Sequence, residues 1–446
     1  MGDGQSIERI AYLTSGAANM YCGSCLHDNT LARAWNQMGV DALLVPTYTP
    51  IRTDEEDVSV DQVFFGGINV FLQQKIFFFR YLPAFLDRFL DKPWLLRMAT
   101  SKGLEISPRA LGALTVSMLK GRNGNQRKEV RRLCKWLSGD IKPDVVLLSN
   151  LLIGGCIPEL KRLGLPVVVT LQGDDIFLED LIEPFKSQAI DILRDLVSNV
   201  DGFLVHSEYY REYMMELLQI PADRIHVVPL GIETKDITKA TTDMNRPRTI
   251  GYMARMSREK GLHILVDAFI QLKQLPDTDD IRLHFAGWRG VTNQQFAEEQ
   301  IQKLKDAGLD DCFVDYGTVD RDGKLGLLHE SDLLCVPTVY QEPKGLFALE
   351  ALAHGVPVVL PDHGAFPEVL GDVGGGHLVR PDDPQALAAC WHAILQDRKA
   401  LSDLGNRGRA AVLERRDSKT MAAKTLEVLQ SILSTPTSDI SPSDKT

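Results

Sequence analysis

The sequence predicts an α/β protein of two domains, each built on a doubly wound parallel β-sheet. Short runs of continuous Val, Leu and Ile alternate with segments of helical periodicity, which is typical of strands that helices bury on both faces. This alternation occurs twice, and a polar, poorly patterned stretch separates the two series. The length of 446 residues also exceeds the roughly 100 to 200 residues of a single domain.

The first series begins with a strand predicted at 10–15, a glycine-containing loop, a helix from about 28 to 38 and a strand at 41–47. This order opens many nucleotide-binding units, but the fuller G-x-G-x-x-G spacing is absent, so the signal is weak. Further strands are expected at 66–73, 144–149, 166–171, 202–206 and 225–229, and helices up to 163, at 185–199 and at 209–218.

The second series follows the polar stretch at 234–247. Its strands are expected at 249–255, 281–286, 312–316, 333–338 and 356–360, and its helices at 262–275, 294–307, 324–330, from 346, at 384–396 and at 399–414. We therefore expect an N-terminal domain over 1–233, a C-terminal domain over 234–420, a closing helix over 421–433 and a disordered polar tail over 434–446.

The composition is that of a soluble globular protein, with 44% hydrophobic and 24% charged residues. A net charge of −11 disfavours nucleic acid as a general partner. No run reaches the ~18 apolar residues of a membrane span, and the N-terminus lacks the apolar core of a signal peptide, so we expect a cytoplasmic protein. Seven cysteines spread along the chain do not suggest a disulfide framework.

The most aromatic segment, 76–98, also carries four Lys and Arg residues. One interpretation is an interfacial helix that makes peripheral contact with a membrane. We favour helices that pack over the sheet or line an acceptor cleft. The reason is that Asp87 and Asp91 dilute the basic face, and Pro83 and Pro93 break the helix.

The stretch 342–359, EPKGLFALEALAHGVPVV, joins a predicted loop to a predicted helix that starts at Leu346. Gly345 and Leu346 place backbone N–H groups at the helix N-terminus, where the helix dipole favours an anion, and glycine lets a ligand approach closely. Glu350 lies one turn further in, among apolar neighbours, where a carboxylate is costly to bury unless it is hydrogen-bonded. A vicinal diol such as a ribose would satisfy it. The alternative is that Glu342 is a solvated loop acid and Glu350 faces solvent.

Two cations, Arg255 and Lys260, flank the turn after the first strand of the second series. They could neutralise a diphosphate and stabilise charge on a leaving group without a metal. A surface salt bridge is the alternative for these two residues alone. Five residues follow predicted strand ends and should converge on a cleft between the domains: Arg255, Gly287, Thr318, Glu342 and Asp362.

Arg255 and Lys260, followed by Glu342-x7-Glu350 and EALAHGVPVV, resemble the nucleotide-sugar domain of family 4 of the retaining glycosyltransferases. The resemblance is specific over about 227–379 and loose elsewhere. It implies the GT-B architecture of two Rossmann-like domains with the active site between them. It also implies sugar transfer from a nucleotide-diphosphate donor to an acceptor, with retention, no metal and no cofactor. The donor base, the donor sugar and the acceptor are not indicated.

The resemblance implies a role for each donor-site residue. Glu350 would bind the ribose, Arg255 and Lys260 the diphosphate, and amides near Gly345 and Leu346 the phosphate or sugar.

Three further roles come from the same resemblance. Glu342 would face the transferred sugar, and Gly16, after the first strand, would close on the phosphates from the other domain. Backbone near 317–319, which includes Thr318, would contact the base. The last helix would cross back to the N-terminal domain.

The sequence departs from the family at two positions. Lys344 stands where members usually have Phe, and it would either add charge near the sugar or point to water. Gln172 stands where many members have a His close to the reacting carbon; Gln can hydrogen-bond a sugar hydroxyl but cannot act as a general acid or base. His206 is a candidate substitute, although a lone His at a strand end is more often structural.

Other chemistry-bearing pairs are weaker signals. Cys22 and Cys25 lack a second close pair for zinc, so loop packing beside an acceptor pocket is favoured over redox or metal roles. Asp174-Asp175 and Asp320-Arg321-Asp322 resemble metal-binding acids, but such short patterns arise by chance. The same fold leaves two rivals open: a GT-B epimerase or phosphorylase, and a non-catalytic protein that kept a degenerate sugar-nucleotide pocket.

Overall fold

The computed structural model describes residues 6–16, 23–51, 53, 55–60, 63–64, 74, 107–235, 237–240, 245–290 and 293–434. The chain divides into two compact units. The first comprises Met1–His206, Arg211–Val228 and Met421–Thr446, and the second comprises Ser207–Tyr210 and Pro229–Thr420. The aromatic segment 76–98, Cys22 and the tail from 435 lie outside the described residues.

The first unit contains a six-stranded parallel sheet in the order β2-β1-β3-β4-β5-β6. Its strands are β1 (Arg9–Thr14), β2 (Asp41–Pro46), β3 (Val145–Leu148), β4 (Val167–Thr170), β5 (Gly202–Val205) and β6 (Ile225–Val227). All four residues of β3, β4 and β5 are buried, as the continuous apolar runs predict.

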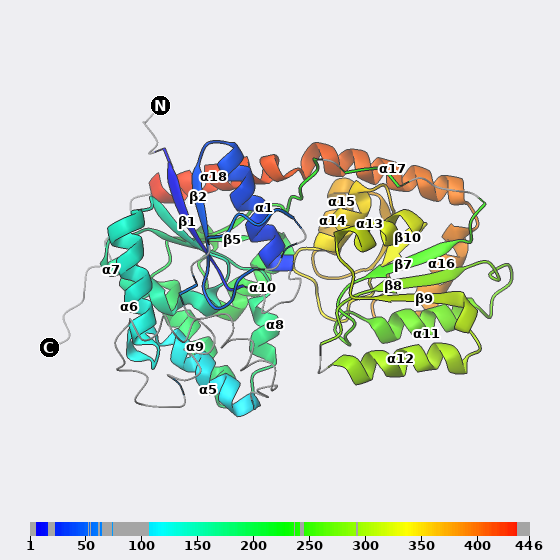
Figure 1. The fold of residues 1–446 in the computed structure, drawn as a ribbon, viewed down its shortest axis with the longest axis horizontal. Helices are drawn as coiled ribbons and strands as arrows, with labels where there is room; N and C mark the ends of the chain where they lie inside the picture. The colour runs from blue at the N-terminus through cyan, green and yellow to red at the C-terminus, as the bar shows by residue number, and fades with distance from the viewer. Residues whose placement is uncertain are drawn as a thin grey trace. The chain divides into compact units, whose positions relative to one another are not determined.

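Helices cover both faces of this sheet (Figure 1). They are α1 (Gly23–Gln37), α5 (Pro108–Leu119), α6 (Arg127–Trp136), α7 (Ile157–Arg162), α8 (Asp174–Glu179), α9 (Phe185–Val197), α10 (Glu208–Leu218) and α18 (Ser418–Ser434). The helix predicted from about 28 begins earlier, at Gly23. The strand predicted at 66–73 lies outside the described residues. Near the C-terminus, α18 packs on α1, where the Trp35 indole N–H donates to the Ala422 carbonyl at 3.0 Å.

The second unit repeats the plan with a parallel sheet in the order β12-β11-β10-β7-β8-β9. Its strands are β7 (Thr249–Met253), β8 (Arg282–Ala286), β9 (Phe313–Gly317), β10 (Leu333–Cys335), β11 (Val358–Pro361) and β12 (Gly376–Val379). The edge strand β12 was not predicted. The two sheets confirm the predicted α/β architecture of two doubly wound parallel-sheet domains.

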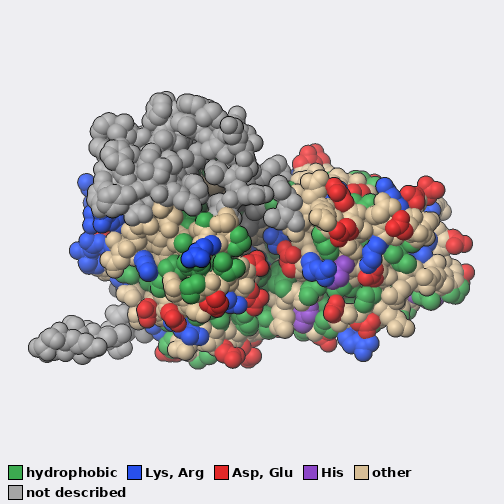
Figure 2. All heavy atoms as spheres, turned by 90° about the horizontal axis from the view of Figure 1, so that it is seen from below, with side chains coloured by type: hydrophobic (Ala, Val, Ile, Leu, Met, Phe, Trp, Pro, Cys, Tyr) green, Lys and Arg blue, Asp and Glu red, His purple; other side chains and the backbone are tan. Residues whose placement is uncertain are grey.

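Helices also cover both faces of the second sheet, with α11 and α12 on one face and α13 and α14 on the other (Figure 1). The α-helices described in this unit are α11 (Leu262–Leu272), α12 (Gln294–Asp306), α13 (Arg321–Glu330), α14 (Leu346–Ala353), α15 (Phe366–Val373), α16 (Pro384–Leu395) and α17 (Arg398–Arg415). On the face of this unit seen in Figure 2, basic side chains are interspersed with acidic ones. Among the described residues, none of the helices combines the length and apolar character needed to cross a bilayer.

Candidate functional site

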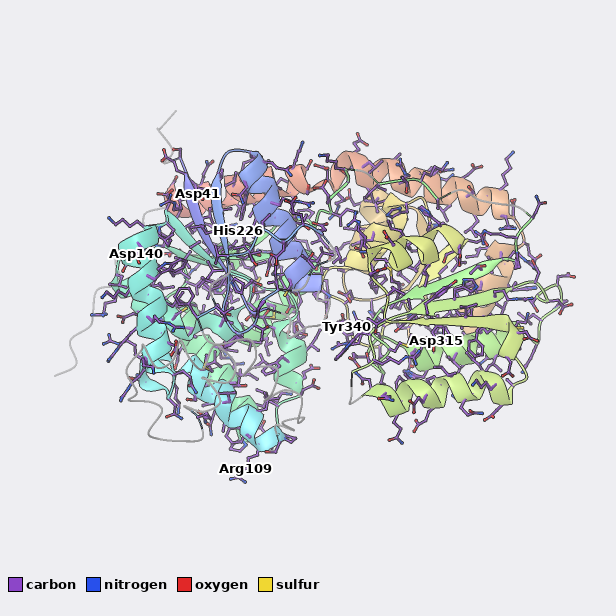
Figure 3. The ribbon with its side chains drawn as sticks, viewed as in Figure 1. Asp41, Arg109, Asp140, His226, Asp315 and Tyr340 are labelled. Atoms are coloured by element: carbon purple, nitrogen blue, oxygen red, sulfur yellow. The ribbon has the colours of Figure 1, made fainter. Side chains whose placement is uncertain are left out.

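A partly buried cluster of Lys260, Tyr340 and Glu342 lies at the carboxyl ends of the strands of the second sheet. The Lys260 Nζ is 2.9 Å from Glu342 Oε2 and 2.6 Å from the Tyr340 hydroxyl. The Tyr340 hydroxyl also donates to Glu342 Oε2, and the Lys260 ammonium stands 4.7 Å from the centroid of the Tyr340 ring. Figure 3 labels Tyr340 beside the strand ends. Parallel sheets bind ligands at this edge, so the cluster stands at the expected place.

The environment of Glu342 favours its ionised form. Only 4% of the residue is exposed, so the alternative of a solvated loop acid is wrong. Burial raises the pKa of this carboxyl, but the Lys260 ammonium, the hydrogen bonds from Tyr340 and Lys260 and the charge of Lys344 lower it by more. The pKa therefore lies below its ordinary value, and Glu342 is a carboxylate at neutral pH.

The close approach of two backbone segments brings Lys260 to Glu342. Gly261 has a φ of +72°, and a Cβ at this position would stand 1.6 Å from the Pro337 carbonyl oxygen. The Val339 N–H donates to the Glu259 carbonyl at 3.0 Å, which ties the same segments together. Only glycine allows this contact, so Gly261 determines how closely the Lys260 loop lies to the segment that carries Tyr340.

The N-terminus of α14 adjoins the cluster. Gly345 is its N-cap with a φ of +70°, and the Gly345 N–H points to Glu342 Oε1 at 3.5 Å. The first-turn N–H groups of a helix have no partners within the helix, and Leu346 at the start of α14 is partly exposed. Lys344 is 7% exposed, so the alternative that it points to water is wrong. Together these features give the site two lysines and a helix N-terminus, which suit an anion.

Glu350 lies one turn further along α14 and has a partner that its sequence neighbours do not supply. The Lys324 Nζ of α13 is 2.8 Å from Glu350 Oε1, and the two side chains are 18% and 17% exposed. The partner comes from 26 residues earlier in the chain. This tertiary contact has no local sequence signal.

Arg255 and Thr318 stand apart from the cluster. Arg255 pairs with Glu259 at 3.0 Å, and its side chain is 41% exposed. Thr318 is exposed in the loop after β9. Within the described residues, neither side chain has a hydrogen bond or ion pair with Lys260, Tyr340 or Glu342.

A second polar cluster lies at the carboxyl edge of the first sheet, around Asp28 of α1. Asp28 is fully buried and accepts from the Tyr12 hydroxyl at 2.5 Å and from the Thr14 hydroxyl at 2.7 Å. The Gln172 amide donates to Asp28 Oδ1 at 2.8 Å and to the Ser149 carbonyl at 3.2 Å. The structure therefore gives Gln172 internal partners, and its contact with a sugar stays a prediction.

Asp28 was missed at the level of sequence, although a signal exists. Positions 28, 31, 32 and 35 share one face of the helix, and Leu31, Ala32 and Trp35 are apolar. A carboxylate on an apolar helix face requires internal donors. Two of its donors come from β1 and one follows β4, so the sequence spacing alone does not identify them.

Two histidines extend this network. His27 Nδ1 is 3.1 Å from Asp28 Oδ1, and the His27 and His206 rings make an edge-to-face contact with centroids 4.5 Å apart. His206 Nδ1 is 2.9 Å from the Val228 carbonyl oxygen. Burial raises the pKa of Asp28, but His27, Tyr12 and Thr14 lower it by more, so Asp28 stays ionised.

The remaining predicted positions have structural explanations. Gly16 has a φ of +81°, and a Cβ there would stand 1.8 Å from the Thr49 carbonyl oxygen. Asp174 accepts from the Leu151 and Gln172 N–H groups, and burial raises its pKa to about 7. Cys25 is buried. In the part of the chain that the structure describes, no group of three or more His, Cys, Asp or Glu residues could hold a metal ion.

Two family models match the chain. Residues 234–411 match the model of glycosyl transferases group 1, and residues 29–231 match that of the glycosyl transferase 4-like domain. The Lys260, Glu342 and Glu350 positions all fall in the first match.

Curated relatives are similar over about half to two thirds of the chain. The phosphatidyl-myo-inositol mannosyltransferase of Mycobacterium leprae is 29% identical over 54% of this chain, which spans 62% of that protein's length. The MMP alpha-(1->4)-mannosyltransferase of Mycolicibacterium hassiacum is 26% identical over 64% of this chain and 70% of its own length.

Solved structures show the same fold over almost the whole chain. Sucrose-phosphate synthase from Thermosynechococcus elongatus has a TM-score of 0.68 at 17% identity, covering 95% of this chain and 99% of its own. The HepE protein of Anabaena, crystallised with UDP and glucose, has a TM-score of 0.67 at 16% identity, covering 95% of this chain and 100% of its own.

Proposed function

Because the chain belongs to family 4 of the glycosyltransferases and has the GT-B fold, we propose that it transfers a sugar from a nucleotide-diphosphate donor to an acceptor, with retention at the anomeric carbon. One observation carries the proposal. The partly buried Lys260, Tyr340 and Glu342 cluster adjoins the N-terminus of α14 at the carboxyl edge of the second sheet. Such a site offers a cation, helix amides and a carboxylate to one ligand.

In this proposal, each part of the nucleotide-sugar donor binds to residues of suitable chemistry. The diphosphate takes Lys260 and the amides that begin α14 at Leu346, while Arg255 approaches from the more exposed side. The ribose takes Glu350, and the base lies against the loop that contains Thr318. The likeness to a protein crystallised with UDP and glucose supports a nucleotide-sugar donor.

The chemistry needs stabilisation of the leaving diphosphate more than a protein acid or base. The anomeric carbon–oxygen bond to the diphosphate breaks, and the acceptor oxygen bonds the same face of that carbon. The proton of the acceptor hydroxyl passes to the leaving phosphate oxygen. Lys260 and the helix amides stabilise the charge that develops there, while Glu342 accepts hydrogen bonds from hydroxyls of the transferred sugar. No metal and no cofactor has a part in this scheme, and Gln172 needs only to hydrogen-bond.

The test is a panel of labelled UDP, GDP and ADP sugars incubated with the purified full chain. We expect slow release of one nucleoside diphosphate, faster release with the right acceptor from cell extracts, and an α-configured product from an α-configured donor. Binding with no turnover under any condition would favour a non-catalytic sugar-nucleotide protein. An inverted product would contradict the retaining step.

A further inference from the structure

The ion pair between Lys324 and Glu350 joins two well-fixed helices of the second unit. Lys324 lies in the first turn of α13, where Asp320 is the N-cap and accepts from the Gly323 N–H at 3.0 Å. Glu350 lies in α14 between Leu349 and Ala351, both of which are completely buried. Two rigid elements therefore present the ammonium and the carboxylate to each other, which holds both near one geometry.

The contact uses one oxygen of the carboxylate. Lys324 Nζ is 2.8 Å from Glu350 Oε1, and within the described residues no other side chain bonds this carboxylate. Oε2 can accept a hydrogen bond from a ligand hydroxyl. A carboxylate accepts hydrogen bonds only, whereas an ammonium only donates. Glu350 therefore offers an acceptor for the proton of a ligand hydroxyl, while Lys324 holds the carboxylate in place.

A contribution to folding stability does not by itself explain why a lysine stands at position 324. The net contribution of a partly buried ion pair to folding is small, because desolvation offsets the attraction, and holding a long lysine side chain costs conformational entropy. A carboxylate fixed before the ligand arrives binds a diol without that ordering cost at the moment of binding.

We propose that Lys324 is a positioning residue of the nucleotide site, which holds Glu350 for the ribose and makes the site select ribose over 2′-deoxyribose. This inference rests on the proposed function, because Glu350 is the ribose contact there. It adds a residue from α13 to a site otherwise built from the loop at 255–261 and the segment 340–350.

The experiment compares binding of ribonucleoside diphosphates with that of their 2′-deoxy forms by calorimetry, using UDP, GDP and ADP on the full chain. We expect the wild type to prefer one ribonucleotide over its 2′-deoxy form by about tenfold or more, the effect of one hydrogen bond to a charged group. Lys324→Met should lose most of this preference, and Lys324→Arg should keep part of it. In a Glu350→Gln background, Lys324→Met should have no further effect, because Lys324 acts through Glu350.

Lys303→Met is the matched control. Lys303 also makes a helix-to-helix ion pair, 2.7 Å from Asp267, elsewhere in the same unit, with side chains that are 48% and 36% exposed. It should leave the ribose preference unchanged. If Lys324→Met kept the wild-type preference, the pair would be structural only and the inference would be overturned. If the wild type bound no nucleoside diphosphate, the proposed function itself would fall, and this inference with it.

Discussion

Replacing Gly261 by alanine tests whether the close approach of two loops keeps the Lys260 cluster together. The new Cβ would stand 1.6 Å from the Pro337 oxygen and 2.5 Å from its carbonyl carbon. Since Cβ contacts below 3.0 Å are essentially never seen, the two segments must separate by at least about 1.4 Å in a close-packed region. Lys260 precedes Gly261 directly, so a shift of this size takes its ammonium beyond hydrogen-bond range of Glu342.

Two costs contribute to the loss of stability in Gly261→Ala. A φ of +72° strains any residue with a Cβ by about 1–2 kcal/mol. The clash with Pro337 adds about 1–3 kcal/mol, as for other overpacked sites. Gly308→Ala is the matched control: its φ is +73°, and a Cβ there meets nothing within 4 Å. The control therefore carries the strain without the clash.

The assay is urea denaturation of both variants at neutral and acidic pH, with calorimetric titration of the donor nucleotide. We expect Gly261→Ala to lose more stability than Gly308→Ala and to bind the nucleotide at least about tenfold more weakly. Its stability should also fall less steeply as pH drops through the acidic range, because Glu342 has lost the ammonium partner that lowers its pKa. Equal losses of stability and equal nucleotide affinity in the two variants would refute the reasoning.

Three further predictions concern buried titratable groups. Lys260→Met leaves the carboxylate of Glu342 buried without its ion-pair partner, so we expect a loss of about 2–4 kcal/mol by urea denaturation. In the wild type, the depressed pKa of Glu342 stabilises the fold above the ordinary value of 4.5, and this contribution is lost as pH falls through the folded-state pKa. In the variant Glu342 lacks its ammonium partner, so this contribution should shrink and stability should fall less steeply over the same pH range; an unchanged slope would contradict the ion pair. Asp28→Asn replaces one acceptor oxygen with an NH2 group that faces hydrogen-bond donors, and it should lower the stability by about 2–4 kcal/mol. The half-exposed Asp41→Asn should lower it by less than about 1 kcal/mol. Equal losses would show that the Asp28 network contributes nothing. Burial lowers the pKa of His354 to about 4, so the unfolded chain takes up a proton first and stability should fall as pH drops from 6.5 to 4. His354→Asn should flatten that part of the stability curve, and an unchanged slope would refute the assignment.

The strands of both sheets were predictable where burial on two faces leaves continuous apolar runs. Residues 145–148 and 167–170 read as strands for this reason, and both are completely buried. The edge strand β12 was not, since GHLV begins with glycine after two more glycines and its residues are only partly buried or exposed. An apolar sequence pattern reflects the burial of the residues, and the residues of an edge strand are less buried than those of a central strand.

The candidate site divides in the same way. Glu342, Gly345 and Glu350 share one loop and helix, so their spacing was visible in the sequence. The partner of Glu350 was not visible, because Lys324 lies on a different helix, and the donors of Asp28 come from β1 and from the loop after β4. Such contacts depend on which strands are neighbours in the sheet, and single-sequence periodicity does not carry that information.

The return of α18 to the first unit has a consequence for how the protein is made. The Trp35 indole N–H donates to the Ala422 carbonyl, which lies 387 residues later in the chain. The Ile432 side chain packs against Gly202, where a Cβ would clash with it. Domains usually fold in order of synthesis, the N-terminal one first. Here the ribosome must translate the whole second unit before α18 can cover its contact surface on the first unit. A fragment that stops at Val228 would therefore expose that surface to chaperones and to other chains.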